Sequence, residues 1–289
     1  MLSKLIKYDF RAIGKVGKPM LLILCGVIVL GMLNAWATGV LVMEVTSQVE
    51  VEPVTTLLLM TSVVMDVLIL FAIAASGVTI LIMAVVHFYK SLLTDEGYLT
   101  FTLPVKPSEL LLSKLISGSV WQLIYFAVIL LGFLLIFTFG IGMSVMLPAW
   151  QAGQLSELIQ GMQSGFAFVE LALDEMFDPY SIVVLVYQYL VMMIYTQLLY
   201  YASVFFGAVI SKKNRVLASV LCIAGGYMIN SIVTSAVNIF VEIFGLIALD
   251  TMSTYMGVTF SLNAIFFTAM SVGLFFLTRY MMDKKLNLP

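Results

Sequence analysis

Asp66 is the residue of this chain best placed for chemistry inside a membrane, because it lies within a long apolar run at 60–87. An ionisable group in such a run is energetically costly and is therefore a functional candidate. It could relay protons for a carrier, or it could be hydrated or paired with a polar neighbour. Glu242 lies near the end of the fifth apolar run. His87 lies at the end of the second, where a helix C-terminus tolerates it without any function.

Amide, phenol and hydroxyl groups recur at helical spacing in two other apolar runs. Polar side chains on one face of a spanning helix must meet another helix or a wet cavity. Interhelical hydrogen bonds and contacts with a transported molecule both satisfy this requirement. Together with Asp66, the candidates for a translocation path are Gln188, Tyr195, Tyr227, Asn230, Thr234 and Asn238.

Motifs for catalysis are missing from the sequence. The chain has no G-x-x-x-x-G-K-[ST] nucleotide loop, no H-E-x-x-H and no G-x-S-x-G. It has one histidine, and Cys25 and Cys222 both lie within apolar runs without metal-site spacing. We therefore expect no enzyme, no catalytic residue, no metal and no cofactor in this chain. Energy for any transport would come from a gradient or from a partner.

The composition indicates an all-α integral membrane protein. The 289 residues are 62% hydrophobic and 10% charged, with a mean hydropathy of +1.10. Continuous apolar runs without period-two alternation favour helices over a barrel. We predict a single transmembrane domain over 1–289. Its six spans are expected at about 19–43, 60–87, 115–141, 181–210, 216–244 and 257–280.

The basic residues predict the orientation of these spans. All 14 Lys and Arg residues fall on one side of the membrane once the spans are drawn. Since cytoplasmic loops carry the Lys/Arg excess, both termini are expected in the cytoplasm. A basic leader and small residues at Ala35 and Ala37 also resemble a signal peptide. The apolar run continues to Met43, so we expect the first span to be retained.

Three segments outside the spans have their own character. Segment 1–18 is predicted to be an amphipathic interfacial helix, with its apolar arc in the membrane and a basic stripe toward lipid headgroups. Asp9 is an exception on the apolar arc. The membrane-surface candidates are Lys4, Lys7, Arg11 and Lys15. Segment 88–114 is expected to be a structured cytoplasmic element in which Ser108 starts the next helix, and 142–180 is expected to be a long outer loop.

The segment between the second and third spans resembles that of a known transporter family. It reads Asp95, Glu96, Gly97, Tyr98, Leu99, then Leu103, Pro104, Val105, and then Ser113, Lys114, Leu115. With the basic N-terminal helix and six spans, this pattern resembles the membrane (permease) subunit of a type-two ABC exporter, particularly those of Gram-positive bacteria. The motif-like part covers 94–115, while the architecture covers the whole chain.

The resemblance implies partners as well as a fold. It implies a coupling or gate helix in 88–114 that docks on a cytoplasmic ABC ATPase subunit, which binds ATP and Mg²⁺. It also implies a second permease subunit, as a homodimer or heterodimer, in the bacterial cytoplasmic membrane, and no nucleic acid. The implied ATPase contacts are Phe88, Tyr89, Lys90, Asp95, Glu96, Gly97 and Tyr98.

Two other functions are compatible with the same sequence. The chain could be a stand-alone secondary carrier or channel that uses Asp66, or an accessory membrane protein without a transport path. Dependence on an ion gradient would favour the carrier, whereas an ATPase partner would favour the exporter. The substrate is not predicted by these residues.

Overall fold

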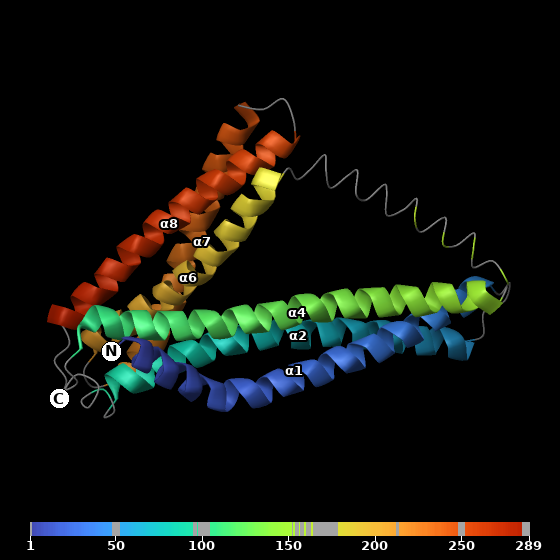
Figure 1. Cartoon of the computed structure of the whole chain (residues 1–289), viewed down its shortest axis with the longest axis horizontal. Helices are drawn as coiled ribbons and strands as arrows, with labels where there is room; N and C mark the ends of the chain where they lie inside the picture. Colours follow the sequence, from blue (N-terminus) through green and yellow to red (C-terminus); the bar gives the residue numbers. More distant parts are fainter. Residues whose placement is uncertain are drawn as a thin grey trace. The chain divides into compact units, whose positions relative to one another are not determined.

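Six long helices make up the chain in this computed structural model. They are α1 (Leu2–Ser47), α2 (Pro53–Leu93), α4 (Pro107–Gln151), α6 (Pro179–Ile210), α7 (Arg215–Ile247) and α8 (Met252–Lys284), shown in Figure 1. The structure describes residues 2–47, 53–94, 97, 105–151, 153, 156, 159, 163, 179–211, 214–247 and 252–284. Within these residues all the regular elements are helical, as predicted.

Each of the six helices contains a stretch long and apolar enough to cross a membrane. The protein is therefore a multi-pass membrane protein, and the prediction of six spanning helices is confirmed by length and composition. Three helices are much longer than a bilayer needs. At 1.5 Å per residue, the 46 residues of α1 extend over about 69 Å, more than twice a hydrocarbon core of about 30 Å.

Helix bounds differ from the expected spans at several ends. The predicted interfacial helix 1–18 and the first span are one continuous helix, α1, with Pro19 inside it. Helix α2 continues six residues past the expected end at His87. Helix α4 begins at Pro107, one residue before the predicted start at Ser108, because proline suits the first turn of a helix. It continues to Gln151, so the first ten residues of the predicted outer loop 142–180 are helical.

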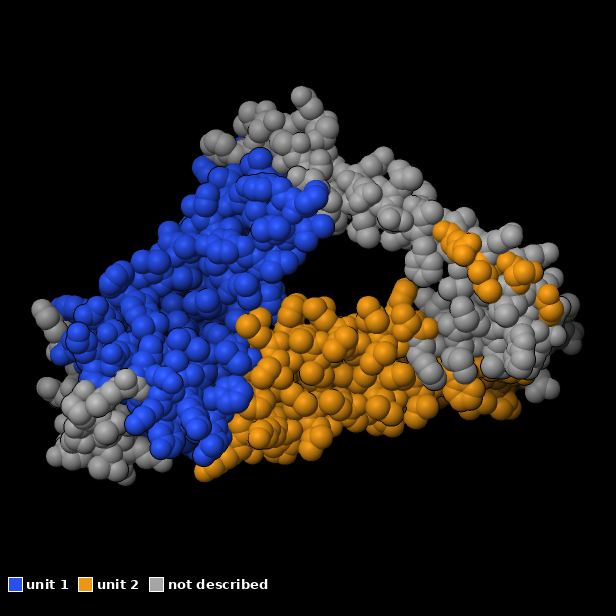
Figure 2. All heavy atoms as spheres, viewed as in Figure 1, with its two compact units in different colours: residues 1–13, 82–120, 169–289 blue, residues 14–81, 121–168 orange. Residues whose placement is uncertain are grey.

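The chain forms two compact units, which are coloured separately in Figure 2. Unit 2 comprises 14–81 and 121–168, and in it α1, α2 and α4 lie side by side. Glycines permit their close approach: a Cβ on Gly31 would lie 2.7 Å from Ile136, and one on Gly132 would lie 2.6 Å from Ile28. A larger residue at either position would therefore force these isoleucine side chains to shift.

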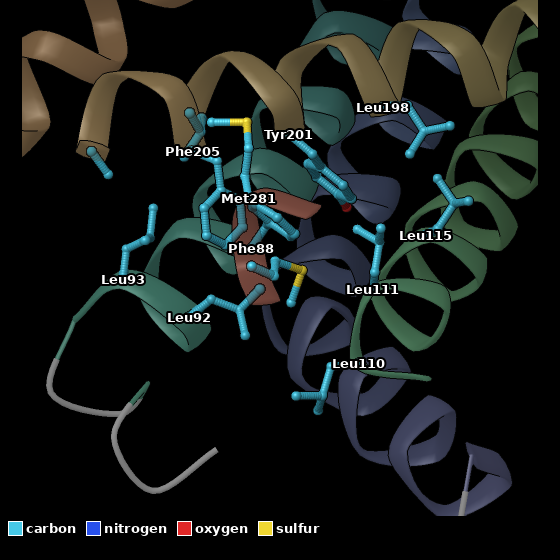
Figure 3. Close-up of a cluster of buried hydrophobic side chains, with 13 residues drawn as sticks. Phe88, Leu92, Leu93, Leu110, Leu111, Leu115, Leu198, Tyr201, Phe205 and Met281 are labelled. Carbon is cyan, nitrogen blue, oxygen red and sulfur yellow. The ribbon is translucent and has the colours of Figure 1, made fainter. Parts of the chain in front are cut away.

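Unit 1 comprises 1–13, 82–120 and 169–289, and it contains the main hydrophobic core. Helices α6, α7 and α8 pack against one another in this unit. Figure 3 shows side chains from α2, α4, α6 and α8 meeting around Phe88, Tyr201 and Met281. The ring of Phe88 stacks on Tyr201 with centroids 3.8 Å apart, and Phe205 meets it edge-on. This core joins the last turns of α2 to the first turns of α4.

Candidate functional site

The first residues of α1 are joined to α2 and α4 by a buried ionic cluster. Asp9 Oδ1 lies 3.1 Å from Lys114 Nζ and 3.0 Å from His87 Nε2. Its Oδ2 accepts a hydrogen bond of 2.7 Å from Ser113 Oγ. We call these four residues the Asp9 cluster. Only 4% of the Lys114 side chain and 13% of the Asp9 side chain are exposed, so the charges are largely removed from water.

The charged members of the Asp9 cluster stabilise one another in their buried positions. A buried ammonium group is stable only with a compensating charge, and Asp9 supplies that charge to Lys114. Three donors converge on the Asp9 carboxyl group, which favours its ionised form. The Ser113 hydroxyl, which is bonded to the Asp9 carboxylate, is completely buried. The cluster therefore serves as a charged link that fixes the N-terminal segment to the end of α2 and the start of α4.

A second polar network lies beside the Asp9 cluster, between α4 and α6. Gln197 is fully buried, and its Nε2 donates hydrogen bonds to Tyr201 Oη at 2.6 Å and to the Lys114 carbonyl at 3.4 Å. Its Oε1 accepts a hydrogen bond of 3.0 Å from Ser119. A Cβ on Gly118 would lie 2.2 Å from Gln197 Nε2. Glycine at this position therefore lets the two helices approach closely enough for the network to form.

Phe88 differs from its predicted role as an ATPase contact. Its side chain is completely buried between Tyr201 and Phe205 in unit 1. A ring in this position cannot reach a partner unless the helices separate, so we assign Phe88 to the core. Its ring instead stabilises the packing of α2 on α6 through its contacts with Tyr201 and Phe205.

The other predicted ATPase contacts are only partly described. Lys90 is exposed on the last turn of α2, and Tyr89 is half-buried against the core. Gly97 is buried, and its N–H donates a hydrogen bond of 2.8 Å to the Thr94 carbonyl. Asp95, Glu96 and Tyr98 lie outside the described residues. Lys90 is thus the predicted contact with the clearest access to a partner.

Helices α6 and α7 bring three of the translocation-path candidates together. Tyr195 Oη donates a hydrogen bond of 2.6 Å to Asn230 Oδ1, and Thr234 lies 3.5 Å from the same oxygen. This interhelical contact is one of the two outcomes expected for polar faces. Gln188 is half-buried on α6, and Tyr227 and Asn238 are exposed on α7.

Helix α7 presents a continuous exposed polar stripe. We define the polar stripe as Tyr227, Ser231, Ser235, Asn238 and Glu242, which share one face at helical spacing and are all exposed. Of the six helices, α7 also has the smallest buried share of its apolar spanning stretch, 6%. Polar groups on a spanning helix are not stable against lipid, so the stripe requires a wet path or another protein surface.

Asp66 has two neutral partners in unit 2. Its Oδ1 accepts a hydrogen bond of 2.6 Å from Asn34 Nδ2, and its Oδ2 accepts one of 2.9 Å from Thr38 Oγ1. Asn34 also donates to the Ser62 carbonyl at 2.9 Å. Of the two alternatives for Asp66, the structure shows pairing with polar neighbours. Asn34 and Thr38 lie four residues apart on α1, and no local sequence pattern links them with Asp66.

The membrane-surface candidates are exposed, but the opposite face of their segment differs from the prediction. Lys4, Lys7, Arg11 and Lys15 are all exposed on α1. Leu5 packs against the core of unit 1 and Ile13 is 3% exposed, so these members of the apolar arc contact protein instead of membrane. Asp9 explains this placement, because a carboxylate on the arc is stabilised by Lys114 and destabilised by acyl chains.

Sequence reasoning missed the Asp9 cluster and the Gln197 network as sites. Asp9 carried a usable signal, since it was the one charged residue on an otherwise apolar arc. Its partners are 78 to 105 positions away in the chain, and nothing in the local pattern connects them. Gln197 carried a weaker signal, because a polar residue in a spanning helix can form its hydrogen bonds with many different neighbours.

Comparison of the chain with protein-family models, with curated proteins and with solved structures found no match.

Proposed function

We propose that this protein is the permease subunit of an ATP-driven exporter of the ABC type. In this proposal it forms a translocation path together with a second permease subunit in a bacterial cytoplasmic membrane. A separate cytoplasmic ATPase binds and hydrolyses ATP. The polar stripe of α7 carries the proposal, because a spanning helix with five exposed polar residues needs a wet path or a partner to be stable in a bilayer.

The Asp9 cluster supports coupling between the path and an ATPase. It fixes α1 to both ends of the predicted docking segment 88–114. His87 lies just before this segment, and Ser113 and Lys114 are its last two residues. Movement of this segment by a closing ATPase would therefore displace α1, α2 and α4 as connected helices. The stacked rings of Phe88 and Tyr201 extend the same connection to α6.

Co-purification tests the proposed partner. The tagged full-length chain, extracted from its native membrane in mild detergent, should retain a stoichiometric subunit that hydrolyses ATP. Glu96→Ala combined with Tyr98→Ala should leave membrane insertion intact and uncouple hydrolysis from export. If the chain purifies without an ATPase, or if this variant keeps its ATPase and exports normally, the assignment of the docking segment is wrong.

A stand-alone carrier is the second candidate, and Asp66 favours it. This carboxyl group lies in a spanning helix and accepts hydrogen bonds from the neutral side chains of Asn34 and Thr38, and none of the described ion pairs includes it. Asp66→Asn should abolish transport by a carrier, while the ATP-dependent transport of a permease subunit should persist. Transport driven by an ion gradient without any ATPase would favour the carrier.

A further inference from the structure

The first turns of α1 carry a basic ridge on their outer face. We define the basic ridge as Lys4, Lys7, Tyr8 and Arg11, whose spacing of three and four residues places them in one row. All four side chains are exposed, and Tyr8 is 68% exposed. The ridge therefore presents three cationic groups and one phenol over about two helical turns.

The opposite face of the same turns is fixed to the protein. Leu5 packs on the core of unit 1, Ile13 is buried, and Asp9 is bonded to Ser113 and Lys114. The segment therefore cannot turn its apolar residues toward acyl chains without breaking the Asp9 cluster. Its contact with its surroundings is made by the basic ridge.

The charge of the ridge is not cancelled by the acidic residue closest to it in sequence. Asp9 points inward, and its negative charge is compensated by Lys114. Among the ion pairs of the described residues, which join Asp9 to His87 and Lys114 and Arg279 to Asp283, none includes a ridge residue. The ridge thus presents three basic side chains that none of these ion pairs neutralises.

We propose that the basic ridge binds the phosphate groups of anionic phospholipids. Charge complementarity and position favour this ligand, since the helix that carries the ridge continues directly into an apolar span. Lysines and arginines beside a spanning helix attract anionic lipids, and tyrosine is enriched where membrane meets water. The site recognises headgroup charge, because its apolar side is occupied by the protein. It does not depend on the proposed ATPase.

A local fluorescent reporter tests this proposal. Ser3→Cys, adjacent to the ridge and exposed, would carry a polarity-sensitive dye in a full-length chain whose Cys25 and Cys222 are replaced by alanine. The detergent-purified protein is titrated with dioleoyl phosphatidylglycerol or dioleoyl phosphatidylcholine. We expect a saturating response to phosphatidylglycerol and little response to phosphatidylcholine. High salt should weaken the response to phosphatidylglycerol.

Two triple variants separate the ridge from other basic residues. Lys4→Gln/Lys7→Gln/Arg11→Gln should need about 100-fold more phosphatidylglycerol, because each cation near an anionic surface contributes about fivefold. Arg11→Gln alone should need about fivefold more. The control Lys90→Gln/Lys106→Gln/Arg279→Gln removes the same charge from exposed positions and should respond like the parent.

Three results would overturn the proposal. The first is a ridge variant that responds to phosphatidylglycerol like the parent, and the second is an equal response to both lipids. The third is a parent that ignores phosphatidylglycerol and responds only to a co-purified ATPase, which would make the ridge a surface for protein binding. Because the reporter is read without an ATPase in the first two cases, failure of this site leaves the proposed permease function untouched.

Discussion

At the scale of single residues, Asp9 has the largest consequences for the structure. An acidic residue among apolar neighbours is unfavourable in an interfacial helix, and the structure resolves this conflict by turning it inward. Lys114 is the residue that most needs the Asp9 charge, since only 4% of its side chain is exposed. The pair is worth little as a net gain over apolar packing, but loss of one partner leaves the other buried without compensation.

Asp9→Asn should therefore destabilise the protein by about 3–5 kcal/mol, the range for an uncompensated buried charge. The matched control is Asp283→Asn, which removes an acid 3.8 Å from its partner Arg279. The side chains of Asp283 and Arg279 are both about half exposed. That change should cost less than about 1 kcal/mol. Thermal or denaturant unfolding in detergent measures both. Equal effects of the two variants would mean that the Asp9 cluster does not hold α1 in place.

At the scale of elements, the spacing between α4 and α6 depends on a glycine. Gly118 lies where a methyl group would meet Gln197 at 2.2 Å and Ala84 at 3.3 Å. Gln197 is held by Tyr201 and Ser119, so it cannot move aside without losing hydrogen bonds. Helix propensity alone would favour alanine at this site, and tertiary contact outweighs it.

Gly118→Ala should consequently lower stability by about 1–3 kcal/mol through overpacking. Gly273→Ala in α8 is the control, because a Cβ there meets nothing within 4 Å. The control should be neutral or stabilising by up to about 1 kcal/mol, since alanine favours helix. Unfolding in detergent again separates the two. If Gly118→Ala is as stable as Gly273→Ala, the close approach of α4 and α6 is not required.

Element ends show how far local sequence signals reach. Pro107 and Ser108 mark the start of α4 within one residue, because the first turn of a helix has its own chemistry. The end of α4 at Gln151 has no such marker, and hydropathy placed it ten residues early. An apolar run alone does not show where a helix ends, since the helix can continue in water or along another protein surface.

At the scale of the whole molecule, composition was sufficient to predict an all-helical membrane protein with six spans. Those properties depend on the average apolarity of long stretches. The Asp9 cluster, the burial of Phe88 and the Tyr195 to Asn230 contact depend instead on which helices become neighbours. Since lipid provides little hydrophobic drive between helices, packing and hydrogen bonds decide those neighbours, and a single sequence does not reveal them.

The central claim is that the polar stripe of α7 lines a path that an ATPase opens and closes. Two single-cysteine variants are made in a chain whose Cys25 and Cys222 are replaced. Asn238→Cys lies on the polar stripe, and Ile229→Cys lies on the opposite face of α7, where Ile229 is 65% exposed. The complex with its co-purified ATPase is reconstituted in vesicles and treated with a water-soluble thiol reagent. The reagent should label Asn238→Cys at a rate that changes several-fold on addition of ATP and Mg²⁺. It should label Ile229→Cys slowly, with no response to ATP. Equal labelling of both positions, or a rate at Asn238→Cys that ATP leaves unchanged, would contradict the proposed path.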